Sequence, residues 1–280
     1  MRDRVITLTD GRQVTLADYG PEGAPAAFYF HGTPTSRLDP LLFEGDIDAS
    51  GTRIVAVDRP GFGGSSAQPG RVLTDWANDV AEVADRLDID TFAVMGLSSG
   101  GSYAIMCAAV LSERVSGIGA VASLADPTWP PMIERRSDEE RAVLASDDED
   151  AVIKFEADRF GADASLFPVG SNGLGAPDVE IFSDDGHGPE LRRSVAESFR
   201  QGIAGFAVDG LVRSRPWAFE PGGITAPCEI LHGEQDVVVQ MAHAERLHEL
   251  IPTSSLTRLP NHGHLSIIAE LPQLAARLTR

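Results

Sequence analysis

A serine flanked by glycines joins an apolar run to a helix-forming run at Gly96-Leu97-Ser98-Ser99-Gly100. A turn this tight forces the serine into strained backbone geometry, which is tolerable when the residues two positions away lack Cβ atoms. The turn also holds the Ser98 hydroxyl at a helix N-terminus, where developing negative charge is stabilised. The pattern predicts a nucleophilic serine, and a glycine-rich turn that cradles a phosphate is the alternative.

Two later loops carry the groups that a serine nucleophile needs. A serine hydroxyl reacts poorly unless a histidine removes its proton and a carboxylate orients that histidine. Asp236 lies in the loop after the apolar run that ends at Leu231, and His264 lies in the loop after the run that ends at Leu259. Proteins of alternating strands and helices place their sites at such strand ends. Ser98, Asp236 and His264 are therefore the candidate catalytic set.

Other residues compete for these roles. Asp126 is an alternative acid, because it also follows an apolar run that predicts a strand. His262 stands two residues before the candidate base, so in an extended segment it points the opposite way, and we expect it behind the site or at the surface. His187 is expected in an exposed loop. His243 and His248 are five residues apart, unlike the pair of a helical zinc site, so we expect no metal ion.

Two earlier loops could complete such a site. Residues 30–34 form a His-Gly loop after a predicted strand, and the Thr33 amide there could pair with the Ser99 amide as an oxyanion hole. The loop that begins at Asp58 follows the next predicted strand. We predict a rigid turn that supports the site, with Arg59 in a structural ion pair rather than in contact with the substrate.

Short apolar runs alternate with helical patterns in the first half of the chain and again near its end. Such runs are typical of strands covered by crossover helices on both faces of a parallel sheet. The predicted strands span residues 26–30, 54–57, 92–95, 117–121, 228–231 and 255–259, after an N-terminal hairpin at 5–9 and 13–17. The predicted helices span residues 75–87, 102–111, 242–250 and the stretch from 266. The fold class is α/β, with a mostly parallel central sheet flanked by helices.

Residues 127–210 break this alternation and are predicted to form a helical cap inserted between two core strands. Residues 1–126 and 211–280 then form the core domain. The predicted elements of the cap are helices that begin at the capping boxes Ser137-x-x-Glu140 and Ser146-x-x-Glu149, a helix from Pro189 to Ala207, and a Gly/Pro/Asp-rich loop from 167 to 186.

The composition is that of an ordinary globular protein of 280 residues, 42% apolar and 23% charged. The net charge of −19 would repel nucleic acid and an anionic membrane surface, so we expect neither as a partner. Cys107 and Cys228 make no disulfide framework, and the N-terminus lacks the apolar run of a signal peptide. We expect a cytoplasmic protein, and the sequence carries no signal about its oligomeric state.

Together, these loops resemble the capped branch of the alpha/beta-hydrolase family, from about residue 5 to the C-terminus. The resemblance rests on the His-Gly loop at 31–32, the Asp-Arg-Pro-Gly-Phe-Gly loop from 58, the serine turn, the His-Gly-x-x-Asp loop at 232–236 and the Gly-His pair at 263–264. It implies Ser98 as nucleophile, Asp236 as acid and His264 as base, with the amides of Thr33 and Ser99 as the oxyanion hole and no cofactor.

The resemblance further implies a serine hydrolase that cleaves a small ester or related acyl substrate through an acyl-enzyme. Haloalkane dehalogenases and epoxide hydrolases are disfavoured, because they carry an aspartate in place of Ser98. Prolyl aminopeptidases, carbon–carbon bond hydrolases and cofactor-free haloperoxidases keep the serine, so cleavage of an amide or a carbon–carbon bond is the alternative. A second alternative is a non-catalytic ligand-binding protein of this fold.

The predicted cap is acidic, with 18 Asp and Glu against 8 Lys and Arg between residues 127 and 210. Charges of one sign around a cleft mouth raise the local potential. We therefore expect a small-molecule substrate that is neutral and partly apolar, with polyanions disfavoured. The alternative is that the acidic residues only solvate the surface.

Overall fold

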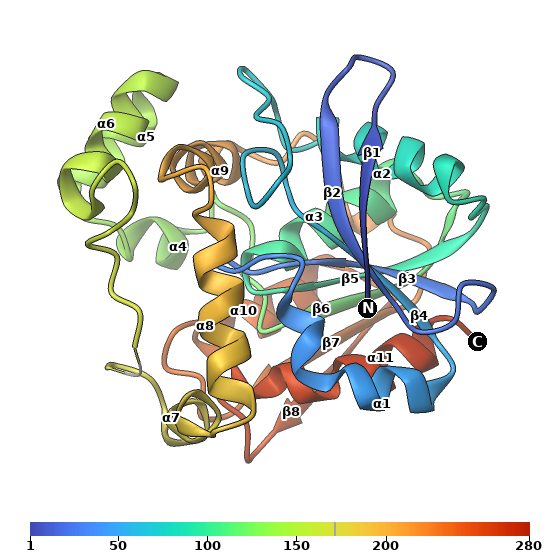
Figure 1. The fold of residues 1–280 in the computed structure, drawn as a ribbon. Helices are drawn as coiled ribbons and strands as arrows, with labels where there is room; N and C mark the ends of the chain where they lie inside the picture. Colours follow the sequence, from blue (N-terminus) through green and yellow to red (C-terminus); the bar gives the residue numbers. More distant parts are fainter. Residues whose placement is uncertain (171) are drawn as a thin grey trace.

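One mixed sheet forms the centre of the protein, whose computed structural model describes residues 1–170 and 172–280. The strand order is β1-β2-β4-β3-β5-β6-β7-β8 (Figure 1). The strands are β1 Arg2–Thr7, β2 Gln13–Tyr19, β3 Ala26–Phe30, β4 Arg53–Val57, β5 Phe92–Leu97, β6 Val115–Val121, β7 Cys228–Gly233 and β8 Ser254–Leu259. β2 pairs antiparallel with β1 and with β4, and every other neighbouring pair is parallel. The mostly parallel sheet is confirmed.

Burial distinguishes the central strands from the edge strands. β3, β4 and β5 are buried at every position, as expected for parallel strands covered on both faces. β1 and β8, at the two edges, alternate between exposed and partly buried residues for most of their length. The carboxyl ends of β3, β5, β7 and β8 lie at one rim of the sheet, and the loops that hold Thr33, Ser98, Asp236 and His264 begin there.

Helices cover both faces of the sheet (Figure 1). Buried side chains of α2, α3 and α10 form the core on one face, and those of α1 and α11 form the core on the other. These helices are α1 Glu44–Ser50, α2 Asp75–Arg86, α3 Ser99–Val110, α10 Met241–Leu250 and α11 Leu271–Leu278. α3 is buried from Ser99 to Ala108, because its small residues let it pack closely on the sheet.

In the described part of the chain, six α-helices lie between β6 and β7 and gather to one side of the sheet (Figure 1). They are α4 Pro130–Glu134, α5 Asp138–Ala145, α6 Glu149–Phe160, α7 Ala176–Ser183, α8 His187–Ser198 and α9 Ala204–Ser214. The boundary expected at residue 210 falls inside α9. Among the described residues, no helix is both long enough and apolar enough to cross a membrane.

The start of α6 differs from the prediction. Ser137 caps α5 as predicted, since its hydroxyl accepts the Glu140 amide at 3.1 Å. Asp148 caps α6 instead of Ser146, because its carboxylate accepts the amides of the first helical turn at 3.0 and 3.2 Å. The Ser146 hydroxyl donates to the Val143 carbonyl in the last turn of the preceding helix. Asp148 stands two residues after Ser146 and is an equally suitable capping residue, so the helix begins later than predicted.

Two more cap elements also differ from the prediction. The helix expected from 189 to 207 is divided into α8 and α9, because Gly202 adopts φ +83° and the Ile203 amide donates to the Ala162 carbonyl at 2.9 Å. The loop expected from 167 to 186, of which residue 171 lies outside the described residues, contains α7. This short helix has no helical apolar periodicity, and its Asp178 instead makes the buried contacts described below.

Candidate active site

Ser98 occupies a strained turn between β5 and α3. Its φ of +54° and ψ of −119° lie in a region that side chains rarely adopt. Glycine is required on both sides of Ser98, because the backbone segments there lie too close together for a side chain. A Cβ at Gly96 would lie 2.2 Å from Gly100, and one at Gly100 would lie 2.0 Å from the Phe30 carbonyl oxygen. The glycine pattern therefore predicted the turn for the correct physical reason.

His264 and Asp236 meet above the ends of β7 and β8. The Nδ1 atom of His264 lies 2.8 Å from Asp236 Oδ2, and Asp236 Oδ1 accepts the amides of Val238 and Val239 at 2.8 and 2.7 Å. Burial alone would raise the pKa of Asp236, but the hydrogen bonds from His264 and Val239 outweigh it and hold the pKa below its usual value. An ionised Asp236 only accepts, so Nδ1 carries the proton and Nε2 is left as a base.

Asp126 lies apart from this pair. Arg246 of α10 donates to one of its carboxylate oxygens at 3.3 Å, and the Thr128 hydroxyl donates to the other at 2.7 Å. The structure therefore brings Asp236, rather than Asp126, to His264.

Thr33 and Ser99 lie beside the serine turn, with their hydroxyl oxygens 2.7 Å apart. Within the described residues, neither backbone amide donates a hydrogen bond. Ser99 is the first residue of α3, so its amide points out of the helix N-terminus. Both amides are therefore available to an oxygen atom.

Arg59 is completely buried in an ion pair with Asp209 of α9, with Nε 3.0 Å from Oδ1. Its guanidinium also donates to the Thr33 hydroxyl at 2.9 Å and to the His31 carbonyl. The structural ion pair predicted for Arg59 is confirmed. Its partner was not predicted, because the two residues are 150 positions apart.

Asp178 of α7 is a second residue that the sequence did not reveal. Its buried carboxylate accepts the amides of His264, Leu265 and Ser266 at 2.7 to 2.9 Å, together with the Ser266 hydroxyl. The carboxylate also fills the space beside Gly263, where a Cβ would lie 2.5 Å from it. A helix of the inserted segment thus fixes the backbone of the histidine loop.

The other histidines are used elsewhere. His243 is buried and accepts the Ala125 amide at 3.1 Å, and burial lowers its pKa to about 4. His262 is partly buried, 3.5 Å from Glu270. His187 is the first residue of α8 rather than part of a loop, and it is partly buried because its ring stacks on Phe43.

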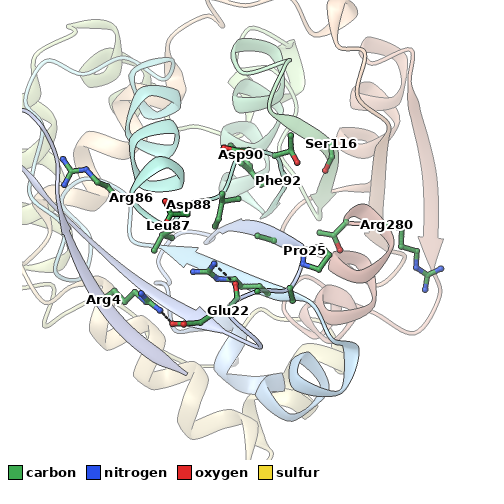
Figure 2. Close-up of a pocket in the computed structure, with 17 residues that line it drawn as sticks. Arg4, Glu22, Pro25, Arg86, Leu87, Asp88, Asp90, Phe92, Ser116 and Arg280 are labelled. Atoms are coloured by element: carbon green, nitrogen blue, oxygen red, sulfur yellow. Dashed lines mark hydrogen bonds and ion pairs between the residues drawn. The ribbon is translucent and has the colours of Figure 1, made fainter.

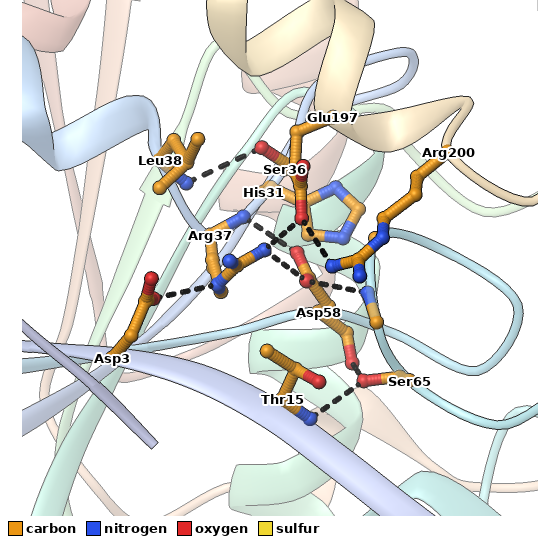
Figure 3. A network of polar contacts seen from close by, with 12 residues as sticks. Asp3, Thr15, His31, Ser36, Arg37, Leu38, Asp58, Ser65, Glu197 and Arg200 are labelled. Atoms are coloured by element: carbon orange, nitrogen blue, oxygen red, sulfur yellow. Dashed lines mark hydrogen bonds and ion pairs between the residues drawn. The ribbon is translucent and has the colours of Figure 1, made fainter. Parts of the chain in front are cut away.

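A buried polar network surrounds Asp58 (Figure 3). Arg37 donates to Asp58 through its amide and its guanidinium, each at 2.8 Å, and the same guanidinium donates to Glu197 of α8 at 2.7 Å. Burial raises the pKa of Asp58 to about 6, even though Arg37 opposes this shift. The loop at 58 is therefore joined to α8 through Arg37, and its support of the site remains a prediction.

A large hollow of about 850 Å³ lies at the opposite rim of the sheet (Figure 2). Its lining includes Ala26, Arg53 and Phe92, the first residues of β3, β4 and β5. It lies at the amino ends of the strands and is far from Ser98. We therefore assign it no part in the site.

Comparison with known proteins identifies the family. A model of the alpha/beta hydrolase family matches residues 23–278. The chain belongs to the alpha/beta hydrolase family. This hydrolase is 28% identical to a bifunctional esterase/perhydrolase of Acinetobacter calcoaceticus, with 92% of each chain covered. It is 30% identical to a non-heme chloroperoxidase of Streptomyces lividans, over 97% of this chain and 98% of the relative.

The fold of the hydrolase also matches solved structures. A thermophilic esterase from Thermogutta terrifontis superposes with a TM-score of 0.72 at 20% identity, covering 99% of this chain and 97% of the other. The predicted alpha/beta-hydrolase fold is thereby confirmed, and the protein is a hydrolase.

Two pockets of the hydrolase open beside Ser98. The apolar pocket, about 200 Å³, is lined by Ser98 and His264 and by residues of α7 and α8 that include Phe182, Leu191 and Val195. The arginine pocket, about 340 Å³, is lined by Thr33, Ser98, Ser99, Arg135, Arg136 and Arg213, together with residues from the segment between β6 and β7 and from the loops after β6 and β7. No hydrogen bond joins Ser98 to His264 in the described part of the chain, and such bonds often form only once substrate is bound.

Proposed function

We propose that this hydrolase cleaves a small carboxylic ester through an acyl-enzyme formed on Ser98. The observation that carries the proposal is the His264–Asp236 hydrogen bond of 2.8 Å at the rim where the strained serine also lies. His264 Nε2 takes the serine proton as Oγ attacks the carbonyl carbon. It then returns that proton to the leaving alcohol, while Asp236 holds the imidazole tautomer and stabilises the imidazolium.

The tetrahedral intermediate needs donors for its oxyanion. The free amides of Thr33 and Ser99 supply them, and the positive end of the α3 dipole adds to their effect. Water then attacks the acyl-enzyme with His264 again as base, which releases the acid and restores Ser98. Apart from the substrate and water, each step uses groups of this chain only.

The segment from 127 to about 214 acts in this proposal as the lid of the site. Its residues close both pockets over Ser98. The apolar pocket supports a substrate that is partly apolar, and its volume of about 200 Å³ is small for a ligand pocket. The cap therefore selects a compact substrate.

Activity screening tests the bond type. We expect hydrolysis of p-nitrophenyl hexanoate, with little turnover of a prolyl anilide or of a dienoate made by ring cleavage. Preferred cleavage of the anilide would place the protein with amide hydrolases, and preferred cleavage of the dienoate with carbon–carbon bond hydrolases. Turnover of none of the three would favour a ligand-binding role and contradict the proposal.

Asp178 gives a second test, as a positioning residue. Asp178→Asn replaces one acceptor oxygen by a donor and leaves part of the His264 loop unpaired. We expect kcat to fall by about 10- to 100-fold while KM changes little. The reason is that a displaced general base slows the chemical step more than it weakens substrate binding. Asp185→Asn, at an exposed position of the same segment, is the matched control and should leave kcat unchanged.

A purely structural role for Asp178 predicts a different outcome. The melting temperature would then fall while kcat of the folded enzyme stayed at the wild-type value. That result would contradict the positioning role.

A further inference from the structure

Three arginines of the inserted segment face the pocket beside Ser98. Arg135 and Arg136 follow α4, and Arg213 lies near the end of α9. The side chains of Arg136 and Arg213 are only 15% and 13% exposed. Three guanidinium groups are thus held around one small space that also contains the nucleophile.

These arginines have too few carboxylate partners. Asp209 binds Arg213 at 2.8 Å but is shared with Arg59 and Arg71. Among the described residues, Arg136 pairs with Glu140 alone, at 3.7 Å, and Arg135 donates to the Val238 carbonyl at 2.9 Å. Four guanidinium groups therefore share two carboxylates, Asp209 and Glu140, while Arg135 pairs with no carboxylate in the described part of the chain and feels Asp236 and Glu140 only from farther away. The other acid of the pocket, Glu156, is already paired with Arg159 at 3.2 Å.

The shortage of carboxylate partners is energetically unfavourable, because the pocket partly shields the guanidinium groups from water. Burial lowers the pKa of both Arg135 and Arg136, and the nearby acids offset this only in part. A buried cation without a full partner is stabilised strongly by an anion that arrives with the correct geometry. Guanidinium groups bind carboxylates with two parallel hydrogen bonds, and their planar shape favours that ligand.

We infer that the arginine pocket binds a carboxylate carried by the acyl part of the substrate. The inference rests on the proposed function and adds the substrate class to it. His264 lines the apolar pocket and is absent from the residues that line the arginine pocket. Because His264 must protonate the leaving alcohol, the alcohol lies in the apolar pocket and the acyl chain in the arginine pocket. The substrate is then a monoester of a dicarboxylic acid.

This inference reverses the neutral substrate expected from the net charge of the cap. That expectation counted 18 acids against 8 bases without knowing where each side chain points. Acids such as Asp138 and Asp158 are exposed at 95% and 67%, where solvent and salt screen them. Arg136 and Arg213 lie largely inside, and Arg135 lies at the more exposed edge of the pocket, so the local charge opposes the net charge of the segment.

A pair of matched esters tests the inference. Mono-p-nitrophenyl adipate and p-nitrophenyl hexanoate share the leaving group and the length of the acyl chain, and differ in a terminal carboxylate. We expect kcat/KM for the adipate, corrected for its uncatalysed hydrolysis, to exceed that for the hexanoate by about 10-fold or more. The preference should largely persist in 0.5 M salt, because a buried contact is screened less than a surface field.

Two variants connect this preference to the pocket. Arg136→Gln should lower kcat/KM for the adipate by about 10-fold and leave the hexanoate within about twofold, because only one ester carries the lost partner. Arg141→Gln removes the same charge from exposed α5, outside the pocket, and should change neither ester. Melting curves of both variants exclude loss of folding as the cause.

Four outcomes would overturn the inference. Equal rates for the two esters, or a poorer adipate that recovers with salt, would refute it while leaving the ester hydrolase intact. A preference for a carboxylate on the leaving group, as in 4-carboxyphenyl hexanoate, would refute the assignment to the acyl side. Hydrolysis of neither p-nitrophenyl ester would overturn the proposed function and the inference with it.

Discussion

Ser98→Ala is expected to lower kcat for p-nitrophenyl hexanoate by a factor on the order of 10⁶, as loss of the serine does in another triad enzyme. The reason is that the variant keeps the amides at the α3 N-terminus but has no atom to form the acyl-enzyme. A fluorophosphonate should label the wild-type protein once, and mass spectrometry should place the adduct on Ser98. The same reagent should leave the variant unlabelled.

Ser99→Ala is the matched control, since it alters the adjacent serine. We assign its amide to the oxyanion hole and its hydroxyl only to a contact with Thr33, so the alanine variant keeps the essential donor. Its kcat should fall far less than that of Ser98→Ala. Wild-type turnover by Ser98→Ala, or an adduct on Ser65 or Ser99, would show that the nucleophile lies elsewhere.

Asp236→Asn should lower kcat by about 10⁴, the loss seen for the equivalent change in another triad enzyme. The asparagine preserves shape and can still accept the two loop amides through its oxygen. It cannot also accept the His264 Nδ1 proton as a carboxylate does, so the imidazole adopts the wrong tautomer. Measuring kcat in both the variant and the wild type tests this directly.

Asp126→Asn provides the comparison for Asp236→Asn. Asp126 is paired with Arg246 near the surface, and such pairs contribute about 0.2–1 kcal/mol to stability. We expect a small change in melting temperature and almost none in kcat. A larger loss of kcat for Asp126→Asn than for Asp236→Asn would reverse the choice of acid.

The candidate site could be predicted from the sequence where its signals are local. Ser98 lies between glycines that the turn itself demands, and Asp236 and His264 each stand a few residues past a strand. The sheet brings these loops together because parallel strands share one carboxyl rim. Hence three residues far apart in the chain were found from three short patterns.

The residues missed act through long-range packing. Asp178 meets His264 across 86 positions, and Asp209 meets Arg59 across 150. No local pattern separates a buried aspartate from the many exposed ones in the same acidic segment. The sequence also could not predict that the Arg136 side chain points inward, because the number of charged residues in a segment does not say where each side chain points.

The two buried aspartates also limit which segments can be exchanged between members of the family in a chimera. Asp178 and Asp209 belong to the inserted segment, yet they satisfy the amides after Gly263 and the guanidinium of Arg59 in the core. A chimera that receives this segment from another member of the family would lose these acceptors, and each buried donor left unpaired costs about 1–3 kcal/mol. Grafts that retain both aspartates should therefore fold and turn over, whereas exchanges that omit them should yield an enzyme with a loosened histidine loop. The unit that can be exchanged while both aspartates are kept is smaller than the insertion: it comprises α4 to α6, with Arg135 and Arg136 between α4 and α5, and it must preserve the packing of Val152 on Ala207 and Leu211 of α9.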